Sequence, residues 1–293
     1  MKYGGKAAQT VAVAPFSPEE FEMIQRLIRT LVGAAVVAAF AGNVAAQDSK
    51  VADELAKYRE ALADGNPADL LEVKGEGLWS EKRGPKNASL EQCDFGLGPG
   101  KLDGAYAQLP RYFKDTGRVM DVESRLVHCM MTLQGLTKEQ ATKNWCSKPG
   151  TESDIEALDT FIGAKSNGMK INVPATHPEE AKMAKVGEYI FYSRSGPQDF
   201  SCAICHGQDG KRIRLQELGN LTTQEGAGVA MKTWPSYRVS QGAVWTMQRR
   251  LIDCMRQARW PEPYYLADSI VALQLFLQKT ATGTVMETPG IKR

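Results

Sequence analysis

The sequence predicts a mainly α-helical protein made of two related domains in tandem, with long irregular loops between the helices. The main observation is an internal repeat: residues 109–130 (LPRYFKDTGRVMDVESRLVHCM) align without a gap with residues 234–255 (WPSYRVSQGAVWTMQRRLIDCM), at an offset of 125 residues. A second pair of similar segments follows, 154–168 and 268–283. Strand-like alternation is sparse elsewhere. Two repeated blocks in the same order indicate a duplicated domain.

Both pairs of blocks predict helices. In the second pair, Ile155, Leu158 and Phe161 recur as Ile270, Leu273 and Phe276, a spacing that places apolar side chains on one helix face. Each copy ends in a glycine, as is common where a helix ends. In the first pair the identical positions are Pro110 and Pro235, Tyr112 and Tyr237, Gly117 and Gly242, Arg125 and Arg250, Leu126 and Leu251, Cys129 and Cys254, and Met130 and Met255.

The first 46 of the 293 residues read as an upstream extension followed by a secretory signal peptide. A segment with two arginines begins at Met23, an apolar run follows, and small residues precede Gln47. The apolar run is shorter than the roughly 20 residues that a membrane span needs. We expect cleavage after Ala46 and export to the periplasm; the alternative is an uncleaved N-terminal anchor.

The remaining chain divides into a first domain at 47–168 and a second at 169–293, because residues 166–180 (SNGMKINVPATHPEE) contain the glycine and prolines of a linker. The formal net charge of +2 argues against broad binding of nucleic acids. No segment after the signal peptide could span a membrane. In an oxidising compartment surplus cysteines tend to pair.

The second domain contains Cys202-Ala-Ile-Cys205-His206, which matches the C-x-x-C-H motif of c-type heme attachment. Two thiols on one helical turn reach the two vinyl groups of a porphyrin, and the histidine is the proximal iron ligand. The motif therefore predicts a cytochrome c-like domain with one covalent heme c, whose first helix lies at 179–194. Two alternatives are a redox dithiol, which lacks its usual βαβ context here, and a zinc site that includes Cys254. The zinc site is awkward because adjacent cysteine and histidine side chains diverge.

The first domain lacks this motif and is expected to keep the scaffold without the heme. It contains Cys93, Cys129 and Cys146. The repeat favours a disulfide between Cys93 and Cys129, which would replace part of the lost core; Cys129 with Cys146 is the rival pair. We expect His128 and His177 to be surface or loop residues.

The sixth iron ligand has several candidates. Methionine is usual in electron-transfer cytochromes, and Met231, Met247 and Met255 are available. The repeated block offers Cys254 instead, with Arg250 one turn before it on the same helix face. A thiolate suits sulfur chemistry, and a guanidinium binds oxyanions. The alternative is a purely structural role, in which Cys254 is a buried helix residue and the neighbouring arginines, Arg249, Arg256 and Arg259, form a solvated face.

These motifs resemble those of the A subunits of the SoxAX cytochrome complex, which starts bacterial thiosulfate oxidation. The similarity covers LEQCDFGLGPG, GAYAQLPRYF, RLVHCM, CAICH and above all RRLIDCMRQARWPEP. Some members of that family carry two hemes. This chain lacks the first C-x-x-C-H and is similar to the single-heme form.

The resemblance implies an L-cysteine S-thiosulfotransferase, which joins thiosulfate to a cysteine of the SoxYZ carrier protein and passes electrons through heme to a cytochrome c acceptor. It also implies a heterodimer with the small cytochrome subunit SoxX. By position, Cys202 and Cys205 would hold the heme and His206 would be proximal. Cys254 would be the distal ligand and catalytic cysteine, persulfidated in the mature protein, and Arg250 would bind thiosulfate. The alternatives are a simple periplasmic electron-transfer cytochrome c, or a docking scaffold for a catalytic partner.

Overall fold

In the computed structural model, the described residues are 65–148, 150–213 and 216–292, with isolated positions upstream. The predicted extension, signal peptide and cleavage after Ala46 lie outside these ranges. Within them the fold is mainly helical, as predicted, and no helix is long and apolar enough to cross a membrane. The helices are α2 (Ala68–Ser80), α3 (Val122–Thr132), α4 (Lys138–Thr142), α5 (Asp154–Ala164), α6 (Pro178–Tyr192), α7 (Cys202–His206), α8 (Gln224–Met231), α9 (Met247–Gln257) and α10 (Asp268–Thr280).

The strands are all short. β1 (Arg111–Phe113) and β2 (Arg118–Met120) form a hairpin, and β3 (Arg212–Ile213) pairs with β4 (Gln216–Glu217). β5 (Ser236–Arg238) lies between β6 (Ala243–Trp245) and β7 (Gly290–Lys292). These strands are not among the predicted elements, because segments of two or three residues are too short to show a clear alternation.

The repeat is visible as two similar hairpin-plus-helix units. The β1–β2 hairpin pairs Tyr112 with Val119, and the β5–β6 hairpin pairs Tyr237 with Val244, 125 residues later in each strand. A helix follows each hairpin. Its N-cap is Asp121 for α3 and Thr246 for α9, again 125 residues apart, and each cap side chain accepts a backbone N–H of the first turn. The offset found in the sequence is therefore also the offset of backbone pairing and capping.

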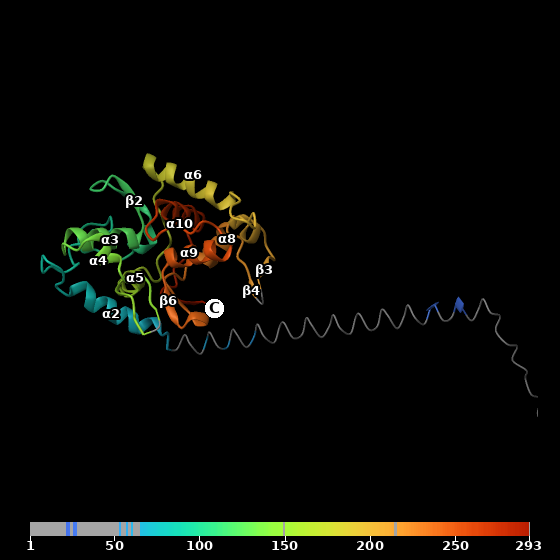
Figure 1. Cartoon of the computed structure of the whole chain (residues 1–293), viewed down its shortest axis with the longest axis horizontal. Coiled ribbons are helices and arrows are strands. Elements are labelled where there is room, and N and C mark those ends of the chain that lie inside the picture. The colour runs from blue at the N-terminus through green and yellow to red at the C-terminus, as the bar shows by residue number, and fades with distance from the viewer. Residues whose placement is uncertain are drawn as a thin grey trace, which may run out of the picture. The chain divides into compact units, whose positions relative to one another are not determined.

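Each unit also contains a long helix packed on a second helix (Figure 1): α2 lies on α5, and α6, the helix predicted at 179–194, lies on α10. A glycine marks each crossing. A Cβ at Gly75 would clash with the carbonyl oxygen of Ala157, and a Cβ at Gly187 would clash with that of Ala272. Glycine is therefore the residue that lets both helix pairs approach so closely.

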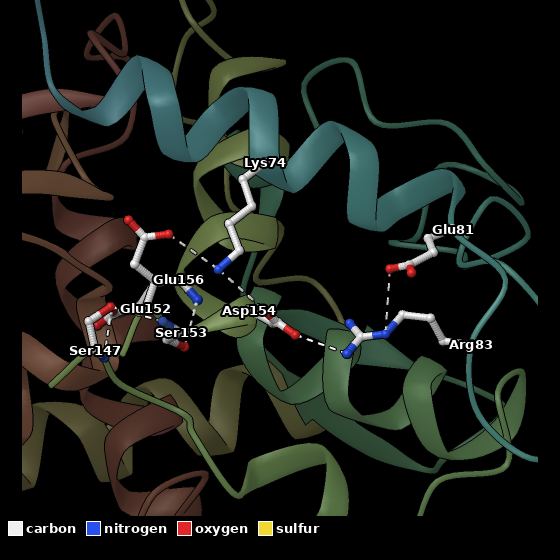
Figure 2. A network of polar contacts seen from close by, with 8 residues as sticks. All are labelled: Lys74, Glu81, Arg83, Ser147, Glu152, Ser153, Asp154 and Glu156. Atoms are coloured by element: carbon white, nitrogen blue, oxygen red, sulfur yellow. Dashed lines mark hydrogen bonds and ion pairs between the residues drawn. The ribbon is translucent and has the colours of Figure 1, made fainter. Parts of the chain in front are cut away.

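Charged side chains reinforce the α2–α5 contact (Figure 2). Lys74 of α2 lies 3.3 Å from Asp154 and 3.4 Å from Glu152, and Arg83 lies 2.9 Å from Asp154. Asp154 belongs to the first turn of α5, where the helix dipole also favours a carboxylate. Each exposed pair contributes little alone, but the shared carboxylates make a network that fixes the start of α5.

A turn leads from each long helix to the position of the heme motif. An isolated β-bridge pairs Arg83 with Ala88 after α2, and another pairs Ser195 with Phe200 after α6, at an offset of 112 residues. At this offset Cys93 is the residue equivalent to Cys205. This agrees with the repeat-based pairing of Cys93 with Cys129, although the identical residues lie mainly in other parts of the repeat.

The two repeated units meet at the N-termini of α3 and α9. Gln248 donates its backbone N–H to Glu123 at 3.1 Å and its side-chain amide to Asp121 at 2.6 Å. Glu123 and Gln248 are equivalent in the repeat, so the two units contact each other through the same positions. The predicted linker also pairs with the C-terminal segment, because Lys170 bridges Val285.

Candidate heme site and the cysteine beside it

The C-x-x-C-H motif forms the short helix α7, capped by Ser201, whose hydroxyl accepts the N–H of Ile204 at 3.2 Å. No residue of α7 is fully buried, although Cys202 and Ala203 pack against the core. One helical turn therefore presents both thiols and the imidazole at a partly covered surface. That is the arrangement that covalent attachment of a porphyrin needs.

His206 is held in one orientation and one tautomer. Its Nδ1 lies 2.9 Å from the carbonyl oxygen of Gly219. A carbonyl only accepts, so Nδ1 carries the proton and Nε2 keeps its lone pair. Burial lowers the pKa of His206, Arg250 lowers it further, and the Gly219 bond opposes both. A neutral imidazole with a free Nε2 and a fixed ring is a ready metal ligand.

Cys254 lies in the third turn of α9 and is partly buried. Burial raises the pKa of its thiol, while Arg250 and Arg238 lower it. Burial raises the pKa of Cys202 to about 12, and Cys254 contributes to this shift. Cys205 contributes to the raised pKa of Cys254. The fold thus brings a third sulfur, from a distant part of the sequence, close to the two thiols of α7.

The methionines that could compete as sixth ligand are in the core. Met231 and Met247 are each 2% exposed and Met255 is 6% exposed. Cys254, which neighbours Met255, is the sulfur that stays accessible on this side of α9. The burial pattern therefore favours Cys254 over a methionine as the ligand.

The arginines of α9 divide into different roles. Arg249 turns toward the first unit, where it pairs with the fully buried Glu156 and donates to the carbonyl of Ser147 at 3.1 Å. Arg250 lies beside Cys254 and contacts Asp253 at 3.2 Å. Arg256 also pairs with Asp253, at 2.5 Å, but 61% of its side chain is exposed. Arg250 is therefore the α9 arginine placed both near the thiol and out of bulk water.

Arg238, at the end of β5, was not singled out from the sequence. It belongs to the charged surroundings of Cys254 and Arg250. Its guanidinium carbon lies 5.5 Å from the ring centre of Trp245. The signal in the sequence was a difference between the repeated blocks, which have Phe113 where the second block has Arg238. Identical positions in the two blocks therefore do not reveal Arg238.

The alternatives based on the other cysteines can be compared with the geometry. Among the described residues, no three His, Cys, Asp or Glu side chains are grouped so as to hold a metal ion, which counts against the zinc site. A disulfide joins Cys93 and Cys129, the pair that the repeat favoured, so the rival bridge to Cys146 is not formed. Cys146 is a free, half-buried thiol.

The two histidines of the first unit and the linker lie away from this site. His128 is partly exposed and lies 3.7 Å from Asp115. His177 caps α6 and stacks on Tyr112 with ring centres 3.7 Å apart. Both have structural contacts of their own.

The residues present fit a heme c. Two partly exposed thiols and an imidazole with a free Nε2 stand on one turn, and a third sulfur approaches from α9. The Nε of Arg238 is buried and has no hydrogen-bond partner. The indole N–H of Trp245, whose ring lies beside Arg238, is also buried without a partner. The Nε of Arg238, in the charged surroundings of Cys254, is therefore an unpaired buried donor that a polar group at this place would satisfy.

Comparison with known proteins agrees with this geometry. The family model "SoxA/TsdA, cytochrome c domain" matches residues 74–171. The chain is 50% identical to the L-cysteine S-thiosulfotransferase subunit SoxA of Hydrogenophilus thermoluteolus, covering 87% of this chain and 94% of the relative. It is 34% identical to a SoxA subunit of Hydrogenobacter thermophilus, covering 85% and 92%.

Among solved structures, the fold is similar to the crystal structure of SoxXA from P. pantotrophus. The TM-score is 0.66 with 25% sequence identity, and the match covers 81% of this chain and 84% of the other. The family model falls on the first unit, which lacks the C-x-x-C-H motif, so the scaffold is recognisable there without it. From the similarity over almost the whole length of its relatives, the chain belongs to the SoxA family, whose members contain cytochrome c domains.

Proposed function

We propose that this chain is the catalytic c-type cytochrome subunit of an L-cysteine S-thiosulfotransferase, which conjugates thiosulfate oxidatively to a cysteine of the Y chain of SoxYZ. The observation that carries the proposal is the position of Cys254, next to the thiols of α7 and one turn after Arg250. The relatives at 50% and 34% identity are named for this activity.

The reaction forms one sulfur–sulfur bond. A carrier thiol and thiosulfate give a cysteine S-thiosulfonate, one proton and two electrons. The proton leaves the carrier thiol as its sulfur bonds to the sulfane sulfur of thiosulfate. The two electrons pass one at a time to a cytochrome c acceptor. Because the bond joins two anionic sulfur species, catalysis requires cationic groups that hold thiosulfate near the reacting sulfur.

One covalent heme c would be held by this chain. Cys202 and Cys205 would form its thioethers, and His206, through Nε2, and Cys254 would be the iron ligands. When bound, the heme supplies the one-electron redox chemistry that thiosulfate and a thiol lack. The Gly219 carbonyl orients His206 by accepting the Nδ1 proton, which strengthens the imidazole as a donor.

Arg250 would bind the sulfonate oxygens of thiosulfate by paired, charge-assisted hydrogen bonds. Cys254 would provide the sulfur that meets the substrate, as a persulfide in the mature protein. The guanidinium next to it lowers the thiol pKa and so opposes the effect of burial. Intact-protein mass spectrometry of the exported protein tests the persulfide, because it would add the mass of one sulfur atom to that of the chain with one heme.

We propose a periplasmic heterodimer with SoxX, which receives SoxYZ and passes electrons to a cytochrome c acceptor. The similarity to the crystal structure of SoxXA supports the SoxX partner. Residues 1–46 would be removed before assembly. Residues 47–168 would form the domain without heme and residues 169–293 the heme domain, a division supported by the matching hairpins, caps and helix crossings of the two units.

The test of this function is thiosulfate-dependent transfer by the purified holocomplex, with reduced cytochrome c and conjugated SoxY measured together. Cys254→Ser should keep the covalent heme and lower turnover by at least about a thousandfold. Cys146→Ser is the matched control, because that thiol is also partly buried and free but lies in the first unit. Full activity of the Cys254→Ser complex would contradict the assigned role, and a simple electron-transfer cytochrome would then explain the heme motif.

A further inference from the structure

Arg238 is a charged side chain without a counter-ion in the described part of the chain. Its guanidinium carbon lies 5.5 Å from the ring centre of Trp245, and its Nε is buried with no hydrogen-bond partner. No ion pair joins it to any described carboxylate. A buried guanidinium nitrogen without an acceptor is costly unless an anion completes it.

In the first unit, the arginine equivalent to Arg250 has a full set of partners. Arg125 there is the equivalent of Arg250. Its guanidinium lies 4.2 Å from the ring centre of Phe113, donates to Asp115 at 2.7 Å and donates to the carbonyl of Asp94 at 2.6 Å. An aromatic face, a carboxylate and a carbonyl therefore surround this arginine completely.

The second unit has changed two of these partners. At the offset of 125 residues, Arg238 stands in place of Phe113 and Ser240 in place of Asp115. A cation has replaced the aromatic face, and a hydroxyl has replaced the carboxylate. Arg250 keeps only a contact at 3.2 Å to Asp253, which is shared with Arg256 and Gln257. The change removes negative charge and adds positive charge at one place.

The electrostatics of the pair agree with this comparison. Burial, together with repulsion from Arg250, lowers the pKa of Arg238 to about 10. Cys254 acts in the opposite direction on Arg238. Two guanidinium groups and one thiol therefore share a partly buried region, and an anion in it would relieve the repulsion between the two cations.

We propose that Arg238 and Arg250 together form an oxyanion subsite next to the sulfur of Cys254, which binds the sulfonate end of thiosulfate. The proposal rests on the proposed function and deepens it, because it assigns a second substrate-binding residue. Two planar donors on different elements can hold a tetrahedral dianion in one orientation, whereas one guanidinium alone leaves it free to rotate. The sulfane sulfur would then face Cys254.

Arg238→Phe and Arg238→Lys test the proposal in the SoxX-bound holoprotein. Phenylalanine restores the arrangement of the first unit, where an arginine packs on a phenylalanine ring, and is therefore compatible with this fold. Lysine keeps the charge without the fork of donors. Arg118→Gln is the control, because Arg118 is an exposed arginine of β2 that pairs with Asp268.

Two measurements give the result: calorimetric binding of thiosulfate to the oxidised holoprotein, and inhibition of the transfer reaction by sulfate, which has the oxyanion but no sulfane sulfur. In Arg238→Phe, the thiosulfate Kd and the sulfate inhibition constant should both rise about tenfold to a hundredfold. Arg238→Lys should lie between this variant and the wild type, and Arg118→Gln should match the wild type. In steady state KM should rise more than kcat falls.

A heme propionate is the other anion that Arg238 could pair with. An unchanged thiosulfate Kd and sulfate inhibition constant in Arg238→Phe would overturn the proposal, and so would a change confined to the heme spectrum and reduction potential. Failure of the proposed function has a different signature, because the wild-type holocomplex itself would then show no transfer. If Arg238→Phe loses heme or secondary structure, the comparison of Arg238→Lys with the wild type decides.

Discussion

Cys254 combines a partly exposed thiol with guanidinium neighbours from two elements, α9 and β5. Burial raises the pKa of the thiol and so favours its protonated form, while the two cations favour the thiolate. The balance makes the charge state of this sulfur sensitive to what occupies the space beside it. Electrostatic control of a cysteine by fixed cations is the usual way in which proteins set thiol reactivity.

Arg250→Ala tests the role of the guanidinium beside Cys254. Removing the guanidinium should raise the KM for thiosulfate about tenfold or more, because a charge-assisted pair of hydrogen bonds is lost. Steady-state kinetics with excess SoxYZ measure the effect. Arg259→Ala is the control, since Arg259 lies beyond the end of α9. An unchanged KM would remove Arg250 from the substrate site.

At the scale of elements, two glycines decide how closely the paired helices approach. Gly75 of α2 lies against the carbonyl of Ala157, but Gly77, two residues later, has nothing within 4 Å of an added Cβ. The same helix therefore contains one glycine that packing requires and one that it does not.

Gly75→Ala should lower the free energy of unfolding by about 1–3 kcal/mol, because the methyl group forces α2 and α5 apart. Gly77→Ala should raise it by about 0.5–1 kcal/mol, since alanine is a better helix former at an exposed position. Thermal and denaturant unfolding of the two single variants gives the comparison. Equal effects of the two substitutions would show that the helix crossing does not depend on Gly75.

The elements also show what the sequence can and cannot predict. The helical spacing of Ile155 and its repeat Ile270 was sufficient to predict α5 and α10, because an apolar face with a regular period is a local signal. The hairpins were missed since each strand has three residues. Arg238 was missed for another reason: its importance comes from a difference between the repeated units, and only the fold shows that it stands beside Arg250.

At the scale of the whole molecule, a cluster of buried carboxyl groups lies where the two units meet. Asp121, Glu123 and Asp159 are each 2% exposed or less. Burial raises the pKa of each, and repulsion from neighbouring carboxylates raises that of Glu123 and Asp159 further. Both oxygens of Asp159 lack a hydrogen-bond partner in the described structure, so it is the member of the cluster with the least compensation.

The cluster predicts how stability depends on pH. A carboxyl whose folded pKa lies above its unfolded pKa binds its proton more tightly in the folded state. Its contribution is therefore fully present below the unfolded pKa and is lost as pH rises toward the folded pKa. Because of these carboxyl groups, the free energy of unfolding of the wild type should fall as the pH increases from about 4 toward neutrality.

Asp159→Asn removes the titration without changing the shape of the side chain, so it should flatten this fall and raise the melting temperature at pH 7 relative to the wild type. Melting temperatures from pH 4 to pH 8 test it. Asp69→Asn is a matched control in the first turn of α2, outside the buried cluster. A pH profile of Asp159→Asn parallel to that of the wild type would show that Asp159 is ionised or compensated in the folded protein.

The most direct test of the central claim is the electron paramagnetic resonance spectrum of the oxidised holoprotein, recorded for the wild type and for Cys254→Met. If the sulfur of Cys254 is the ligand opposite His206, the wild type should show the low-spin signals of thiolate-type ligation, and the methionine variant should lose them while keeping its covalent heme. Identical spectra for the two proteins would place some other atom on the iron and would contradict the assignment of Cys254.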